Sequence, residues 1–579
     1  MSFTAPTTEQ LFVLKTIAGI EELASHERFA EATPDLVEAI VEGVGQFAEG
    51  EFAPLNRIGD LEGAKVVEGR VKMPQGYAEA YQHYVEQGWN ALSVPVEHGG
   101  QGLPFTLAAV ALDSLGAANM AFTLCPILTV GAIESLHHHG TDEQKALYLP
   151  KLATGEWTGT MNLTEPQAGS DVGALRSTAT PRGDGSWSIS GQKIFITYGD
   201  HDMAGNIIHL VLARTPDAPP GTKGISLFLV PKYRLDEKGE PGEENGVKTV
   251  SIEHKMGINA SPTCVLQFGE TGESIGWLIG PEFGGMRAMF TMMNNARLNV
   301  GMQGVQIAEA ATQKALEFAR ERIQSARAGG ASRDPVAIVE HPDVRRMLLR
   351  MRAGTQASRA LLYFAAAHVD RASLGLDGAQ EMLELLTPLA KTYATDMGSE
   401  VASLGVQVHG GMGFIEETGA AQYYRDIRIG AIYEGTNGIQ SADLVGRKLG
   451  LGGGDVMRGL IQRIGQDAGA HAGLAQLAGA CGEVTEYMLG ANMDDRLAGS
   501  YPYCTMLAVA VSGWLMAKQL AAATAMLDAG EGNSDFLKAK QIACRFYLDR
   551  MVPEAIGLMS SAMAGSALLY ALDADGLAA

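Results

Sequence analysis

The spacing of apolar residues changes twice along the chain, and this constrains the fold more than any single motif. Between about residues 35 and 155, apolar residues recur at the three- and four-residue intervals of amphipathic helices. From about 158 to 280 the pattern changes to short β-rich runs separated by Gly, Pro and Asp. After Glu282 the helical period returns. The chain is therefore predicted to be an α+β protein, with a β-rich segment between two helical ones.

Four domains follow from this pattern, because 579 residues are too many for one ordinary core. Residues 1–157 are predicted to form an N-terminal helical domain and residues 158–280 a compact antiparallel sheet or barrel. Residues 281–449 are expected to form a C-terminal helical bundle. A glycine-rich run at 450–454 is expected to act as a hinge. An additional helical domain is predicted over 455–579.

Two stretches at the start of the β-rich segment carry candidate binding groups. In LTEPQAGSD (163–171), a bent loop exposes backbone amides and hydroxyls that suit a ring edge and a pyrophosphate. A plain turn explains the same Pro and Gly residues equally well. In KIFITYG (193–199), strand alternation puts Phe195 and Thr197 on one face, where they suit a flat ring system. Alone, this stretch is simply a good strand.

A third candidate lies in the second helical segment, in GVQVHGGMGF (405–414) and YYRDIRIGAIYEGTNGIQ (423–440). The glycine turn at 410–413 lacks the strand–helix context of a dinucleotide fingerprint. Glu434 stands between the apolar pair Ala431–Ile432 and a Thr-Asn-Gly turn, a setting that suits a general base. A surface glutamate that caps a helix remains an alternative.

Three consecutive histidines, His137 to His139, raise the question of a metal site. They precede Gly140, and Thr141 with Gln144 has the pattern of a new capping box. Histidines in the last helical turn before a glycine are ordinary, and no further ligands stand near them in sequence. No metal is therefore expected.

Taken in this order and at these separations, the motifs resemble the acyl-CoA dehydrogenase family over residues 35–449. The resemblance implies the fold of that family: a helical bundle, a middle β-domain and a second helical bundle, here with an extra helical domain. It also implies FAD as cofactor, a homodimer, and an electron-transfer flavoprotein as acceptor. The expected reaction is α,β-dehydrogenation of an acyl-CoA thioester to the trans-2-enoyl-CoA, by an oxidoreductase acting on a CH–CH bond.

The resemblance assigns site residues by position. Glu434 corresponds to the catalytic base. The alternative base position of other branches is here Ala296, which cannot accept a proton. Phe195 replaces a frequent Trp, and Ser325, beside Gln324, replaces a usual aromatic. The cofactor-binding positions are Leu163, Thr164, Gly169, Ser170, Phe195, Thr197, Arg322, Gln324, Gln407, Gly411, Thr436 and Gly438. The substrate-binding positions are Ser170, Asn294, Arg297, Tyr433 and Gly435.

The length, the opening SFTAPTTEQ and the runs at 53–60 and 198–232 resemble a long bacterial branch of the family. That branch includes enzymes that convert 3-methylmercaptopropionyl-CoA to methylthioacryloyl-CoA in dimethylsulfoniopropionate breakdown. The resemblance alone implies this substrate, since nothing in composition indicates sulfur. General short- or medium-chain acyl-CoA dehydrogenation in fatty-acid β-oxidation is the alternative.

Composition narrows the partners and the compartment. The net charge of −22 disfavours nucleic acid and anionic membranes. Five scattered cysteines without ligand spacing favour a reducing cytoplasm. No signal peptide is visible, and the apolar stretch near 506–517 is too short to span a bilayer. We therefore expect a cytoplasmic protein without membrane or nucleic-acid partners.

Two rival functions share the fold. An acyl-CoA oxidase would use the same base but pass electrons to oxygen. A non-catalytic relative that binds or scaffolds other molecules would be expected to lack the base and to carry a basic C-terminal face. Here Glu434 is present, and residues 455–579 contain more acidic than basic side chains. Both features favour the enzyme.

Overall fold

The structure is a computed structural model that describes residues 3–578, except for the side chains of residues 292–294. The chain divides into two compact units. The helical unit comprises Pro6–Val41 and Val300–Ala579, and the sheet unit comprises Ser2–Ala5 and Glu42–Asn299. The division falls inside two helices, α3 (Pro34–Phe47) and α8 (Gly285–Glu321).

The sheet unit contains helices before its strands, as the change in period predicts. Its helical elements are η3 (Ala48–Phe52), α4 (Ala53–Glu62), α5 (Tyr77–Glu86), η4 (Trp89–Ala91), η5 (Val96–His98), α6 (Phe105–His139), α7 (Asp142–Thr154), η6 (Val172–Ala174) and η7 (Thr222–Gly224). Its strands are β1 (Lys65–Val67), β2 (Arg70–Lys72), β3 (Trp157–Asn162), β4 (Thr178–Pro181), β5 (Trp187–Thr197), β6 (Asn206–Ala213), β7 (Ser226–Pro231), β8 (Tyr233–Leu235), β9 (Pro241–Glu244), β10 (Val247–Ile252), β11 (Thr263–Phe268) and β12 (Ser274–Ile279). The hairpin β1–β2 interrupts a stretch that was expected to be helical.

The main sheet has eight strands, in the order β10-β11-β5-β12-β7-β6-β3, with β4 paired to β5. All pairs are antiparallel except β3 and β6, which are parallel. The predicted antiparallel sheet is therefore found, with this one parallel pair as an exception. β3 enters directly from α7, and β6 follows a long excursion through β4 and β5, so the two run in the same direction. Beyond β3, the Ile194 amide of β5 donates to the Thr164 carbonyl (2.9 Å), which curls the sheet.

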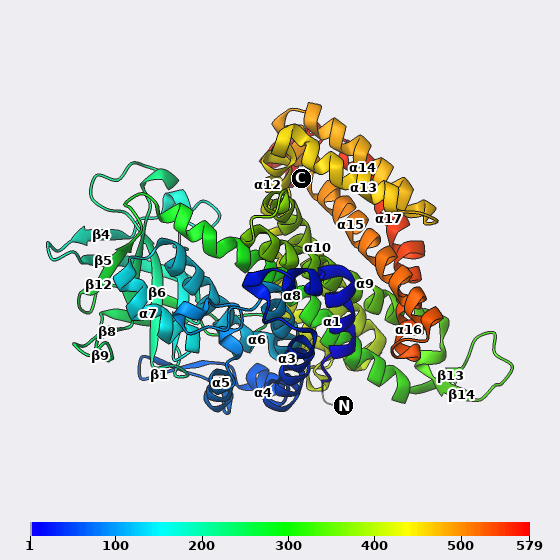
Figure 1. Cartoon of the computed structure of the whole chain (residues 1–579), viewed down its shortest axis with the longest axis horizontal. Coiled ribbons are helices and arrows are strands. Elements are labelled where there is room, and N and C mark those ends of the chain that lie inside the picture. The colour runs from blue at the N-terminus through cyan, green and yellow to red at the C-terminus, as the bar shows by residue number, and fades with distance from the viewer. Residues whose placement is uncertain (1–2, 579) are drawn as a thin grey trace. The chain divides into compact units, whose positions relative to one another are not determined.

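The sheet is buried on both faces at its centre. Every residue of β6 and β7 is buried, which matches their nearly continuous apolar sequence. One face packs on α6 and α7 through a cluster that includes Leu152, Trp157 and Leu210. The other holds a second cluster that includes Val211 and Phe228. Figure 1 shows the strands of this unit gathered around β6.

The helical unit accounts for the rest of the chain. Its elements are α1 (Thr7–Val13), η1 (Leu14–Ala18), α2 (Ile20–Ala24), η2 (Glu27–Phe29), β13 (Ile323–Ala326), β14 (Pro335–Ala337), η8 (Ile338–Glu340), α9 (Pro342–Ser373), α10 (Ala379–His409), η9 (Gly410–Phe414), η10 (Glu416–Thr418), α11 (Ala420–Ile427), η11 (Arg428–Ala431), α12 (Asn437–Gly446), η12 (Lys448–Gly454), α13 (Asp455–Asp467), α14 (Ala472–Gly490), α15 (Met493–Ala529), α16 (Ser534–Phe546), η13 (Tyr547–Met551), α17 (Val552–Ile556), α18 (Met559–Ala562) and α19 (Ala574–Ala578).

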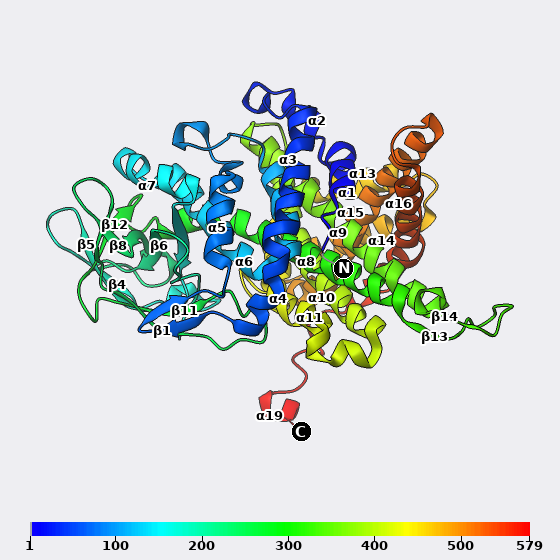
Figure 2. The ribbon, with the colours of Figure 1, turned by 90° about the horizontal axis from the view of Figure 1, so that it is seen from below.

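Within this unit, α10 packs against α9, α12 and α15, and α15 also packs against α14 and α16. Helices α6 and α15 are each long and apolar enough to cross a membrane by length and composition. Their most apolar windows are, however, 94% and 83% buried within the protein, which is typical of core helices. The hairpin β13–β14 projects beyond the neighbouring helices in Figure 2.

Candidate active site

Glu434 lies in a short connection between η11 and α12, in the helical unit. Its backbone has φ of +53°, and the next residue, Gly435, has φ of +80°. A left-handed glutamate costs conformational energy, and such residues persist where the surroundings hold them in place. The Glu434 side chain is half-buried. The loop therefore presents this carboxylate through a strained backbone that tertiary contacts must fix.

Those contacts come from three helices. The Tyr433 hydroxyl donates to the Gln303 side chain of α8, and burial raises the pKa of Tyr433 above its ordinary value. The Lys391 ammonium of α10 donates to the Gly435 carbonyl at 2.9 Å. The Gln440 amide of α12 donates to the Glu434 carbonyl at 3.3 Å. The backbone carbonyls of Glu434 and Gly435 thus both accept hydrogen bonds from buried side chains.

Lys391 extends this clamp to the start of α12. Its ammonium, on a fully buried side chain, also donates to Asn437 Oδ1 at 2.8 Å. Asn437 Nδ2 in turn donates to Asp396 Oδ1 (2.8 Å), and Asp396 Oδ2 accepts from the Tyr501 hydroxyl (2.5 Å). Burial raises the pKa of Asp396, although hydrogen bonds from Tyr501 and Asn437 oppose that rise. A buried polar network of this kind makes the loop position specific.

The N-terminus of α12 follows the loop at once. The Thr436 hydroxyl accepts from the Ile439 amide (3.1 Å) and caps the helix. Gly438 is exposed in the first turn. The helix N-terminus favours an anion, which is compatible with the cofactor-binding role expected of Thr436 and Gly438.

In the sheet unit, the loop at 163–171 is organised by a buried ion pair. Glu165 is 4% exposed, and its Oε1 accepts from Lys193 Nζ (2.8 Å) and from the hydroxyl and amide of Ser177 (2.6 and 3.0 Å). Its Oε2 accepts from the Arg176 amide (2.6 Å). Burial alone would raise the pKa of Glu165, but the Lys193 ammonium and these donors lower it to about 2.

The same ion pair sets the backbone of the predicted cofactor residues. Lys193 Nζ also donates to the Leu163 carbonyl (3.1 Å), and the next strand residue, Ile194, binds the Thr164 carbonyl. Leu163 and Thr164 are half-buried, whereas Gly169 and Ser170 are exposed beyond them. Four of the predicted cofactor positions therefore lie along one loop anchored to β5.

Phe195 and Thr197 occupy β5 next to that anchor, on either side of the buried Ile196. A β-bulge interrupts the pairing of β5 with β11 at this point, and Phe195 adopts φ of +59°. Its ring is 58% exposed. Phe195 is exposed and Thr197 is half-buried, and the bulge that interrupts the strand at Phe195 is not visible in the sequence.

The remaining cofactor positions lie in the helical unit and are exposed. Arg322 follows α8, and Gln324 lies in the projecting hairpin, where its carbonyl accepts from His341. Gln407 lies near the C-terminal end of α10, sixteen residues beyond Lys391, or about 24 Å along the helix, and Gly411 follows in η9. They are therefore not brought together with Thr436 and Gly438 within one chain.

Only some of the predicted substrate-binding residues lie next to Glu434. Tyr433 and Gly435 flank Glu434, and Arg297 is 8% exposed on α8, next to the buried Ala296. Ser170 lies in the exposed loop of the sheet unit. The side chain of Asn294 lies outside the described residues.

These residues fit the FAD that the resemblance implies. An exposed aromatic ring on a bulge suits a flat ring system. A Cβ built on Gly169 or Gly411 would meet no other atom within 4 Å, so a ligand can approach the backbone there. The first turn of α12 suits a phosphate group. Aromatic face, open backbone and anion site are the features that such a cofactor requires.

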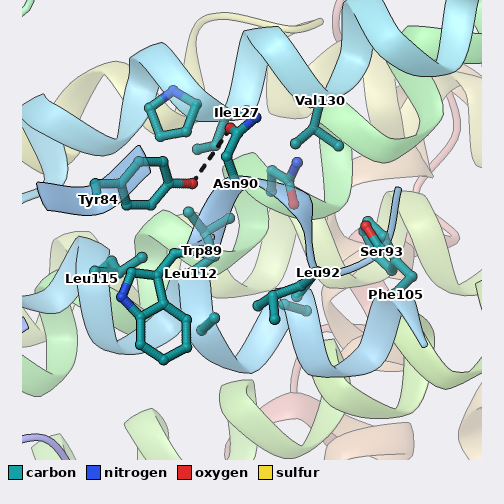
Figure 3. Close-up of a pocket in the computed structure, with 15 residues that line it drawn as sticks. Tyr84, Trp89, Asn90, Leu92, Ser93, Phe105, Leu112, Leu115, Ile127 and Val130 are labelled. Carbon is teal, nitrogen blue, oxygen red and sulfur yellow. Dashed lines mark hydrogen bonds between the residues drawn. The ribbon is translucent and has the colours of Figure 1, made fainter. Parts of the chain in front are cut away.

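A separate cavity of about 50 Å³ lies among the helices of the sheet unit. Figure 3 shows Tyr84, Trp89, Leu112, Leu115 and Ile127 around it. Its polar groups satisfy one another: the Tyr84 hydroxyl donates to Asn90 Oδ1 (3.5 Å), and Asn90 Nδ2 donates to backbone carbonyls of α7. The remaining wall is mostly apolar, which suits an uncharged apolar group.

Sequence reasoning missed two residues, Glu165 and Lys391. Glu165 lies inside a motif that was singled out for its glycines and hydroxyls. Lys391 stands alone in the apolar run of α10, and a lone charge at the core period is the signal that could have revealed it.

Four family models cover most of the chain. They are described as the N-terminal (residues 35–156), middle (160–271) and C-terminal (284–449) domains of acyl-CoA dehydrogenase, and as an acetyl-CoA dehydrogenase C-terminal-like domain (459–573). The predicted fold class, with its extra helical region, is thereby confirmed.

Individual proteins of known name are also similar to this chain. A 3-methylmercaptopropionyl-CoA dehydrogenase of Ruegeria pomeroyi is 46% identical over 96% of this chain and 97% of its own. A butyryl-CoA dehydrogenase of Syntrophomonas wolfei is 36% identical, over 87% of this chain and 88% of its own. The solved structure of an acyl-CoA dehydrogenase from Bacillus anthracis, complexed with FAD, matches with a TM-score of 0.75. It covers 95% of this chain and 91% of its own, at 22% identity.

Proposed function

Because this chain belongs to the acyl-CoA dehydrogenase family, we propose that it is a FAD-dependent enzyme in which Glu434 removes the α-proton of an acyl-CoA thioester. The observation that carries the proposal is the strained loop that holds Glu434, with both adjoining carbonyls clamped by buried side chains. The family makes the protein an oxidoreductase that acts on acyl-CoA. The base, the cofactor and the substrate are the finer points proposed here.

The chemistry requires a base fixed against the α-carbon, because a thioester α-proton is only weakly acidic. When bound, FAD supplies the acceptor for the hydride that leaves the β-carbon as the double bond forms. Glu434 takes the proton, and the Lys391 and Gln440 contacts keep its backbone from relaxing. By the resemblance, Leu163 and Thr164 would contact the flavin or its pyrophosphate and Phe195 and Thr197 the flavin. Thr436 and Gly438 would contact its adenine half or pyrophosphate.

Lys391 serves as a positioning residue for Glu434. We expect Lys391→Met to lower kcat by about 10–100-fold, since a small displacement of a catalytic group has effects of this size. The loss should persist when kcat is expressed per bound flavin, because Lys391 also bonds Asn437, which lies between the cofactor positions Thr436 and Gly438. Steady-state kinetics and flavin quantification measure both.

The matched control is Lys448→Met, which removes a lysine paired with Glu384 in a more exposed site. A small change in kcat is expected there. An equal loss of kcat in both variants, or a change in KM alone in Lys391→Met, would contradict the positioning role.

We propose 3-methylmercaptopropionyl-CoA as substrate. A relative that is 46% identical over 96% of this chain is named for that substrate. Short- or medium-chain acyl-CoA of β-oxidation is the alternative.

A substrate panel tests this assignment. With an artificial electron acceptor, kcat/KM should be highest for 3-methylmercaptopropionyl-CoA, with butyryl-CoA next and octanoyl-CoA lowest. Preference for octanoyl-CoA in wild type would discard the sulfur substrate.

The remaining proposals concern the oligomeric state, the electron acceptor and the location in the cell. A homodimer is supported by the apolar surface of Met412, Phe414 and Ile415, exposed by 50%, 85% and 45%. In a homodimer, Gln324, Gln407 and Gly411 would reach the cofactor bound by the other chain, since their own chain does not bring them near Thr436. An electron-transfer flavoprotein is the proposed acceptor. Free, buried cysteines support a cytoplasmic location.

A further inference from the structure

Three metal-ligating side chains from distant parts of the sequence meet in the sheet unit. Glu97 and His98 lie in η5, and His137 lies in the last turn of α6. His98 Nε2 stands 3.0 Å from His137 Nδ1 and 3.6 Å from Glu97 Oε1. One ligand atom from each residue lies within 4.8 Å of the other two. The triple histidine alone gave no reason to expect this, because its partners lie about forty residues earlier.

The spacing suits a small divalent cation. With metal–nitrogen bonds of about 2.05 Å, two ligands in a tetrahedral site stand about 3.3 Å apart. The observed separations of 3.0 and 3.6 Å bracket that value. The ligand atoms of Glu97 and His137, which lie within 4.8 Å of each other, would have to move closer together to complete the geometry. Binding would displace the proton that the two imidazoles share in their hydrogen bond.

The surroundings favour a cation and hold two of the ligands firmly. The C-terminal end of α6 carries the negative end of the helix dipole, beside His137. The loop bearing His98 is closed by backbone bonds from Gln101 to Ala91, Gly102 to Val94 and Leu103 to Leu92, each 2.9 Å. The His98 side chain is 14% exposed, and that of Glu97 is 69% exposed. Two rigid imidazoles therefore face a carboxylate that is free to turn toward them.

From this geometry we propose that Glu97, His98 and His137 form a structural site for a divalent first-row transition cation, with Zn²⁺ as the probe. Two imidazoles and one carboxylate are a ligand set that such ions favour, and water completes the coordination. The cation ties the loop to the end of α6. Leu92 and Ser93, at the start of that loop, line the cavity of the sheet unit shown in Figure 3, so the cation steadies part of the cavity wall.

The test is equilibrium binding of Zn²⁺ to the full-length protein, after treatment with a chelator. Wild type should bind one Zn²⁺ per chain at this site, and its melting temperature should rise with Zn²⁺. His98→Asn and His137→Asn should each weaken binding by at least about 10-fold and abolish the rise in melting temperature. His138→Asn is the matched control, since His138 neighbours His137 but lies outside the set, and it should behave like wild type.

Anomalous diffraction from wild-type crystals soaked in Zn²⁺ gives a readout independent of folding in the variants. A peak between His98 and His137 supports the site. No Zn²⁺ bound to wild type, equal binding by His98→Asn, or a peak elsewhere only would overturn it, leaving the pair as a hydrogen bond between two histidines.

Discussion

Replacement of Glu434 by Gln is expected to lower kcat for acyl-CoA dehydrogenation by about 10²–10⁴-fold, with flavin content unchanged. Gln keeps the size of the side chain and the hydrogen bonds of the loop, which run through the carbonyls of Glu434 and Gly435. It removes the negative charge and the ability to accept a proton. Rapid mixing of enzyme with substrate, with the reductive half-reaction followed by flavin absorbance, measures the effect.

Glu417→Gln is the matched control, because it changes an exposed glutamate of the same unit in η10. Its kcat should equal that of wild type. If Glu434→Gln retained more than a tenth of the activity, another group would have to act as base. Ala296, at the alternative position of the family, offers no such group.

The second large effect is expected from Glu165→Gln. The change leaves the Lys193 ammonium buried without its carboxylate, and breaking a buried pair in this way costs about 3–5 kcal/mol. The loop at 163–171 should loosen at the same time, so that the protein is isolated with less flavin. Denaturant unfolding and flavin quantification measure the two losses.

Three comparisons sharpen this prediction. Glu273→Gln removes a carboxylate from an exposed pair with Arg182 and should cost less than about 1 kcal/mol. Replacing both buried partners, Glu165→Leu with Lys193→Met, should recover much of the lost stability. The stability difference between wild type and Glu165→Gln should be full above about pH 4.5 and should vanish as pH falls through about 2. This follows because folding lowers the pKa of Glu165 from 4.5 to about 2.

Much of the fold could be predicted because helices and strands differ in how their apolar residues are spaced. Helices show intervals of three and four residues, and the strands here are short apolar runs between turn residues. The apolar runs at 207–213 and 225–230 coincide with the buried strands β6 and β7. The parallel pairing of β3 with β6 could not be predicted, since it depends on where distant strands lie side by side. The β1–β2 hairpin was missed because its three-residue strands are too short to show a period.

The candidate site divides in the same way. Glu434, Thr436 and Gly438 could be identified because they lie within one short motif that resembles the family. The contacts that fix Glu434 come from Lys391 and Gln303, which are 43 and 131 residues away, and no local pattern links them. The outward turn of Phe195 depends on a bulge opposite β11, which is likewise a tertiary feature.

The most direct measurement is an anaerobic titration of the purified wild type and of Glu434→Gln with 3-methylmercaptopropionyl-CoA, beside butyryl-CoA and octanoyl-CoA. The account predicts a yellow protein whose flavin is bleached by the methylmercapto substrate in wild type, and a variant that stays yellow. A wild type without flavin, or bleaching that persists in Glu434→Gln, would contradict it.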